Sequence, residues 1–148
     1  MSVQENKTIV QRFLNEAWNN RDLTVLDEVM AEDHVAHDPN APGGALHGCE
    51  AIREILQHGF AGMPDARIEI EDVIGEGDRV LVRYTVYGTH LGDLFGVPAS
   101  GRQVKVATFH VCRFAGARIV EQWALKDMLG LLQQIGAIPT PEAVPAGA

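Results

Sequence analysis

The sequence predicts an α+β domain in which N-terminal helices pack on a cone-shaped, curved antiparallel sheet. Apolar residues recur at helical spacing in the first part of the chain, and they alternate with polar residues after residue 65. Helices followed by a series of long strands are typical of the α+β class. The 148 residues carry no internal repeat or linker, so we expect one domain over residues 1–136. A sheet curved around helices encloses a pocket, which is a natural site for a small ligand.

Three helices are predicted before the strands begin. Residues 4–20 carry one apolar stripe, and Asp22 is placed to cap the second helix, which follows it. The prolines and glycines of residues 34–48 exclude a long regular element, so we expect a loop there with room for one short strand. Residues 49–61 again carry apolar side chains on one helical side.

Four strands are predicted in the second half of the chain. The first begins at Ile68, where isoleucine alternates with glutamate, and GEGD at 75–78 turns the chain into a strand at 79–89. A long irregular connection follows. Residues 103–114 and 118–125 then form a hairpin around an Ala-Gly-Ala turn.

A short helix and a tail end the chain. Asp127 is placed to cap the helix. The tail contains three prolines and several alanines, a composition typical of disorder, so we expect residues 137–148 to be disordered.

Composition excludes several classes of partner. The net charge is -8 and the pI is near 5.1, whereas nucleic acids and anionic membranes are bound by basic surfaces. The sequence begins with no apolar signal segment and contains no run long enough to span a bilayer. Cys49 and Cys112 lack metal or redox spacing, which favours a reducing setting. We therefore expect a cytoplasmic protein.

Histidines in the Pro/Gly-rich segment are the first candidates for chemistry. His34 and His37 in HVAHD suggest a metal pair, but no third ligand follows at a useful spacing, so we expect no metal site. A histidine at a pocket mouth can exchange protons near neutral pH, and Asp38 is placed to orient one. The alternative is that these polar residues only satisfy local backbone groups.

His110 is the most informative single residue. Strand alternation places it with Thr108 and Cys112 on the more apolar, core-facing side. A buried neutral histidine needs a hydrogen-bond partner or a ligand. A lone core histidine is more often satisfied structurally, so both interpretations stay open.

The last hairpin has two different faces. Gln122 and Ala124 lie on one face, and Trp123 lies on the other, where a Trp packs a core or a subunit interface. Asp127 is either a pocket carboxylate or only the cap of the last helix. Other candidates for lining a pocket are ordinary core residues: Phe13, Trp18, Phe60, Met63 and Tyr84.

The run VLVRYTVYGTHLGDLFGVPASGRQVKV, followed by FHVCRFAGARIVEQWALKDMLGLLQQIG, resembles the SnoaL-like polyketide cyclase family. This family belongs to the superfamily named after nuclear transport factor two. The likeness covers residues from about 5 to 136. It implies a cone-shaped α+β barrel, usually dimeric, with a pocket between helices and sheet. Cyclases of this kind close a ring by an intramolecular aldol reaction with acid/base side chains and neither metal nor cofactor.

Carried over by position, His110 matches the family's pocket-facing strand histidine, and His37 matches a common loop histidine. The family's key aspartate falls on Ala124 here, whereas the second aspartate of that ending is present as Asp127. A methyl group cannot accept a proton, and loss of a general base typically lowers the rate by roughly 10²- to 10⁴-fold. The acid/base role has then moved to His110, His37, Asp38 or Asp127, or cyclisation has been lost.

Three hypotheses follow. The first is a cofactor-free acid/base enzyme (an aldol cyclase, isomerase, dehydratase or hydrolase) for an apolar carbonyl, ester or polyketide-like ligand, with His110 transferring the proton and His37 assisting. The second is a non-catalytic protein that binds a small apolar or aromatic ligand in the same cavity, motivated by Ala124. The third is an association module whose homodimer face lies around Trp123.

Overall fold

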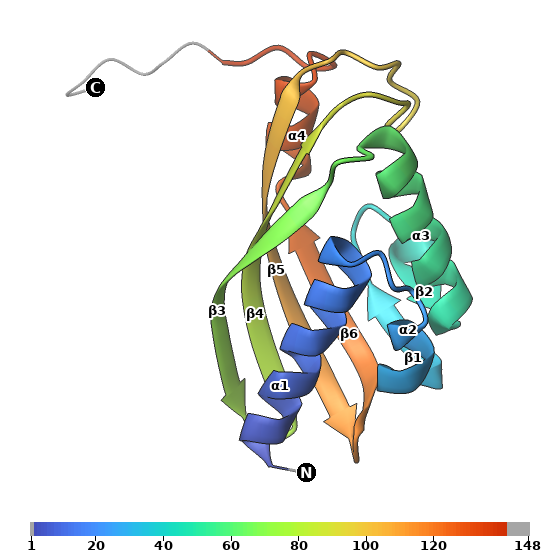
Figure 1. Cartoon of the computed structure of the whole chain (residues 1–148), viewed down its shortest axis with the longest axis vertical. Helices are drawn as coiled ribbons and strands as arrows, with labels where there is room; N and C mark the ends of the chain where they lie inside the picture. The colour runs from blue at the N-terminus through green and yellow to red at the C-terminus, as the bar shows by residue number, and fades with distance from the viewer. Residues whose placement is uncertain (1, 142–148) are drawn as a thin grey trace, which may run out of the picture.

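The computed structural model describes residues 2–141 and contains one curved, unclosed six-stranded sheet with helices α1 and α3 across one face (Figure 1). We call the face that packs on the helices the inner face and the opposite one the outer face. The α+β prediction is confirmed. Most of the tail for which disorder is predicted, residues 142–148, lies outside the described residues.

The first helix consists of a regular α-helix followed by one π-helical turn. Helix α1 spans Val3–Leu14, and Ser2 caps it by accepting a hydrogen bond from the Glu5 N–H at 3.1 Å. The chain continues as a π-helical turn, η1, over Asn15–Asn19. The side chain of Asn19 bonds both the N–H and the C=O of Ile68, which connects this turn to the strand that contains Ile68.

The second helix is shorter than its apolar pattern suggests. Helix α2 spans Val25–Val29, and Thr24 occupies its N-cap position. The prediction that Asp22 caps this helix is therefore wrong. The Asp22 carboxylate instead accepts a hydrogen bond from the Thr24 N–H two residues later and stabilises the turn before the helix. Strand β1 begins directly afterwards, at Met30.

The sheet has the strand order β2-β1-β6-β5-β4-β3. Its members are β1 Met30–His37, β2 Ala45–His47, β3 Arg67–Glu76, β4 Arg79–Thr89, β5 Gln103–Ala115 and β6 Arg118–Lys126. Neighbouring strands are antiparallel except β1 and β6, which are parallel. The prediction of an antiparallel sheet is thus wrong at this one pairing.

Strand β1 also corrects the loop predicted over residues 34–48. The loop signals are confined to residues between the two strands, where Pro42–Gly44 form a 3-10 turn. On either side, β1 and β2 pair as a short antiparallel ladder. Only a few residues of β1 are buried, so its sequence lacks a clear period of two.

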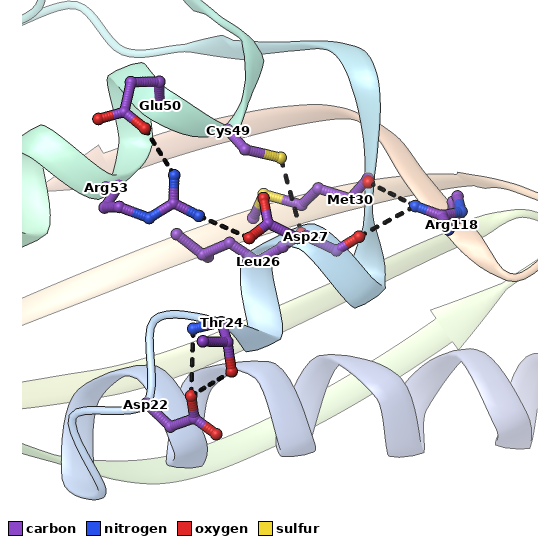
Figure 2. Close-up of polar contacts among 9 residues, drawn as sticks. All are labelled: Asp22, Thr24, Leu26, Asp27, Met30, Cys49, Glu50, Arg53 and Arg118. Carbon is purple, nitrogen blue, oxygen red and sulfur yellow. Dashed lines mark hydrogen bonds and ion pairs between the residues drawn. The ribbon is translucent and has the colours of Figure 1, made fainter.

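Polar contacts anchor the junction between α2 and β1 (Figure 2). Arg118 at the start of β6 donates to the carbonyl oxygens of Asp27 and Met30, both at 3.1 Å. From the other side, Arg53 on helix α3 (Gly48–Gly62) pairs with Asp27 at 2.8 Å and with Glu50 at 2.6 Å. These contacts hold β1 against β6 in the parallel register.

The end of the domain follows the prediction. Helix α4 spans Met128–Gln134, and the Asp127 carboxylate caps it by accepting from the Gly130 N–H at 2.9 Å. The side-chain amide of Gln134 bonds both backbone groups of Lys105, which fixes α4 on β5. Within residues 2–141, no helix is long and apolar enough to cross a membrane.

The long connection between β4 and β5 is irregular, as predicted, but it is organised by a histidine. His90 is fully buried. Its Nδ1 lies 3.2 Å from the donating N–H of Ser100 and 2.8 Å from the Ser100 hydroxyl, and its Nε2 lies 3.1 Å from the Val97 carbonyl oxygen. This pattern assigns the neutral tautomer with the proton on Nε2.

Candidate active site on the inner face of the sheet

Polar side chains gather at the middle of the inner face, on strands β4, β5 and β6. The antiparallel register places His110 between Val82 on β4 and Ala124 on β6. Tyr84 lies opposite Thr108 on the same face, and the rings of Tyr84 and His110 meet edge to face with centroids 5.5 Å apart. The predicted inward placement of His110 is confirmed.

The environment of His110 keeps its imidazole neutral. Its Nδ1 is buried and has no hydrogen-bond partner among the described residues, although the residue as a whole is only half-buried. The pKa of His110 is lowered to about 4, mainly by burial and also by the charge of Lys126, while the charge of Asp38 opposes the shift. At neutral pH the ring is therefore uncharged and can accept a proton, and part of the residue remains exposed.

Three more buried polar side chains on the inner face of the sheet lack partners among the described residues, and Asn6 on helix α1 has an unpaired Oδ1 as well. The three on the sheet are the hydroxyl of Thr108, the amide nitrogen of Gln122 and both ring nitrogens of His34. All three residues are at most 4% exposed. Buried polar groups are normally hydrogen-bonded, and leaving one unpaired costs about 1–3 kcal/mol. A bound polar ligand or water would satisfy these atoms, so the inner face is the strongest candidate for a ligand site.

Burial also determines which groups on this face are charged. It lowers the pKa of His34 and raises the pKa of the Tyr84 hydroxyl. It raises the pKa of the Cys112 thiol to about 12. These three groups are consequently neutral at pH 7.

An ion pair adds two opposite charges to the site. The Lys126 Nζ lies 3.8 Å from the Asp38 Oδ2, and the two side chains are 28% and 13% exposed, respectively. Both charges act on His110, and that of Asp38 also acts on Tyr84. Sequence reasoning missed Lys126, although alternation continued two residues beyond Ala124 places it on the same face.

His37 does not join His110, contrary to the prediction that it assists. Its ring stacks on Trp123, with centroids 5.4 Å apart, and its Nε2 lies 2.7 Å from the Glu121 carboxylate. Trp123 and Glu121 lie on the outer face. The reason is that residues 34–37 form a strand rather than a loop, so alternation sends His34 inward and His37 outward.

The remaining predicted residues take ordinary structural positions. Asp127 is exposed and caps α4, so we assign it to that role. Phe13, Met63 and Tyr84 are buried in the core, while the partly buried Trp18 and Phe60 meet edge to face with centroids 5.5 Å apart. Within residues 2–141, no three His, Cys, Asp or Glu side chains are placed to hold a metal ion together.

The outer face carries an apolar groove of about 380 Å³. Its lining residues are His37, Asp38, Pro39, Gly44, Phe109, Val111, Trp123, Ala124 and Leu125. Phe109 and Leu125 are 46% and 62% exposed. The register pairs His110 with Ala124 and Val111 with Trp123, so these two pairs lie on opposite faces as predicted, although Asp38 and Ala124 also border the groove.

Comparison with known proteins gives one consistent result. A family model described as SnoaL-like polyketide cyclase matches residues 8–135. The chain is 30% identical over 122 residues to the aklanonic acid methyl ester cyclase DauD of Streptomyces sp. (strain C5), covering 80% of this chain and 71% of DauD. It is 32% identical over 119 residues to the aklanonic acid methyl ester cyclase DnrD of Streptomyces peucetius, covering 78% of this chain and 77% of DnrD. The crystal structure of a candidate SnoaL-like polyketide cyclase from Jannaschia sp. CCS1 matches with a TM-score of 0.82 at 28% identity, covering 92% of this chain and 94% of that one.

Proposed function

The chain belongs to the SnoaL-like polyketide cyclase family, and from this premise we propose that it is a cyclase-like enzyme in which His110 transfers the proton. Its substrate is a small, mostly apolar molecule with a carbonyl or ester group, of the polyketide type. The curated relatives are ester cyclases, which supports this substrate class.

The reaction needs only proton transfer. The neutral imidazole of His110 removes a proton from a carbon next to a carbonyl, and the electron pair of that C–H bond moves into an enolate. The enolate carbon then bonds to a second carbonyl carbon of the same molecule, which closes the ring. The new alkoxide takes its proton back from the imidazolium, so the reaction as written consumes no cofactor.

One observation carries the proposal. The ring of His110 is neutral, partly accessible and unpaired at Nδ1, in the middle of the helix-covered face of the sheet. Thr108 and Gln122 supply further unpaired polar atoms on the same face. Groups without protein partners are available to a substrate, whereas a purely structural histidine such as His90 has both nitrogens bonded.

The proposal is tested with aklanonic acid methyl ester as the probe, because the relatives are named for it. Changing His110→Ala should lower turnover by at least about tenfold, since the base is removed. His37→Ala is the matched control, because that ring lies on the outer face, and it should keep near-normal turnover. Equal turnover in wild type and His110→Ala would reject the assignment.

Ala124 supports a second candidate function, a protein that binds such a ligand without converting it. The methyl group lies opposite His110. The resemblance to the family implies a key aspartate at this position. The same probe separates the two functions. Saturable binding without turnover by the wild-type protein would favour the binding protein, and turnover would exclude it.

Two further proposals concern the setting of the enzyme. We propose that it is a homodimer whose subunits meet over the apolar groove of the outer face, because Phe109 and Leu125 are exposed there. We also propose that it works in the cytoplasm, where its two unpaired cysteines would stay reduced.

A further inference from the structure

Ala124 raises a specific question about charge. If His110 takes a proton, the site must stabilise an imidazolium and an enolate, yet residue 124 supplies no carboxylate. The buried groups Tyr84, Cys112 and His34 are neutral, as shown above, so they supply no charge either. Any compensation has to come from other side chains on the inner face.

The parallel pairing of β1 and β6 places a carboxylate beside the position of the missing one. In this pairing Ala36 lies next to Gln122, and His37 lies next to Trp123. One residue further along both chains, Asp38 follows His37 and Ala124 follows Trp123. Asp38 is the first residue after β1. It borders the outer groove, but its carboxylate is directed to Lys126, on the face that carries His110.

Lys126 completes the arrangement from β6. It lies opposite Thr108, on the face that carries His110 and Ala124, and its Nζ is 3.8 Å from the Asp38 Oδ2. A long and flexible cation that is largely sheltered from water keeps most of its electrostatic effect. The two side chains thus place one negative and one positive charge within electrostatic reach of the imidazole without changing the net charge of the site.

We infer that Asp38 and Lys126 together replace the carboxylate that is absent at position 124. Asp38 acts through His110 as a positioning residue, because its negative charge favours the imidazolium that forms when the proton is taken. Lys126 is the catalytic partner, because its ammonium faces the developing enolate oxygen and stabilises its negative charge. This inference rests on the proposed role of His110.

The first test uses the resting protein and needs no substrate. The pKa of His110 is followed by NMR titration of its ring in wild type, Lys126→Met and Asp38→Asn. Removal of the cation should raise the pKa of His110 above its wild-type value of about 4, and removal of the carboxylate should lower it further. The double variant Asp38→Asn/Lys126→Met leaves no unpaired charge and should titrate between the two single variants.

The second test is turnover of aklanonic acid methyl ester. Lys126→Met should lower kcat by at least about tenfold even though it makes His110 a stronger base, and Lys126→Arg should recover part of the loss. If Lys126 only depressed the basicity of His110, Lys126→Met would instead be faster than wild type.

The outcomes separate this inference from the proposed function. If His110→Ala keeps wild-type turnover, the proposed function fails. If His110→Ala is inactive while Lys126→Met and Asp38→Asn turn over normally, the paired-charge inference alone fails. Should one single variant not fold, the double variant carries the test, because it lacks both charges and normal turnover in it would overturn the inference.

Discussion

At the scale of single residues, the behaviour of His110 follows from burial next to two opposite charges. Burial lowers its pKa to about 4, so the imidazole is neutral over the physiological range. A neutral ring can act as a base but not as an acid until it has accepted a proton from the substrate. The same ring therefore supplies the proton that the alkoxide needs at the end of the reaction.

The position of His110 could be predicted because every second residue around it on β5 is buried, namely Val104, Val106 and Thr108 before it and Cys112 and Phe114 after it. The ion pair could not be predicted in the same way. Lys126 is the last residue of β6 and is followed by Asp127, which caps helix α4. From the sequence alone, Lys126 is therefore as compatible with the start of the helix as with the end of the strand. Its partner Asp38 lies 88 residues earlier and is brought close only by the parallel β1–β6 pairing.

At the scale of elements, β1 is where sequence and structure differ most. The inward residues of β1 include a histidine, and its outward residues are both polar and apolar, so polar and apolar residues do not alternate clearly. The prolines that follow the strand also suggest a loop. The position of β1 is instead stabilised by a residue distant in sequence, because Arg118 on β6 donates hydrogen bonds to the carbonyl oxygens of Asp27 and Met30. This error explains why His37, predicted to assist His110, lies on the outer face while His34 lies on the inner face.

The β4–β5 connection makes an element-scale prediction. His90 links Val97 and Ser100 from a fully buried position, so His90→Ala should lower the free energy of unfolding by about 1–3 kcal/mol. Urea unfolding measures the loss, and amide hydrogen exchange at Ser100 should become faster because its acceptor is gone. His58→Ala on the exposed side of α3 is the control, and equal stability of both variants would refute the role of His90.

At the scale of the whole molecule, the sheet separates two functions onto its two faces. The inner face holds the unpaired polar groups and the ion pair, and the outer face holds the apolar groove beside His37 and Trp123. Strand alternation predicted this division for β5 and β6. Successive side chains of a strand point to opposite faces, so a change of register by one residue would move every side chain to the other face. The substrate cannot be read from the same pattern, because it depends on the detailed shape of the site.

The outer groove predicts the oligomeric state. Wild type should sediment as a dimer at micromolar concentration, and Leu125→Glu should sediment as a monomer, because a charge would be buried in the apolar contact. Leu91→Glu is the matched control, because Leu91 is 57% exposed but lies in the β4–β5 connection, outside the groove. A monomeric wild type, or a dimeric Leu125→Glu variant, would contradict this prediction.

The central claim, that His110 transfers the proton, is tested most directly by the pH dependence of kcat/KM in wild type, with the ring of His110 titrated by NMR in the same buffers. The neutral ring is the active form, so the rate should be constant near neutral pH and fall as the pH drops through the pKa of about 4. This acid limb should coincide with the titration of His110. An acid limb that lies well away from the titration of His110 would contradict it.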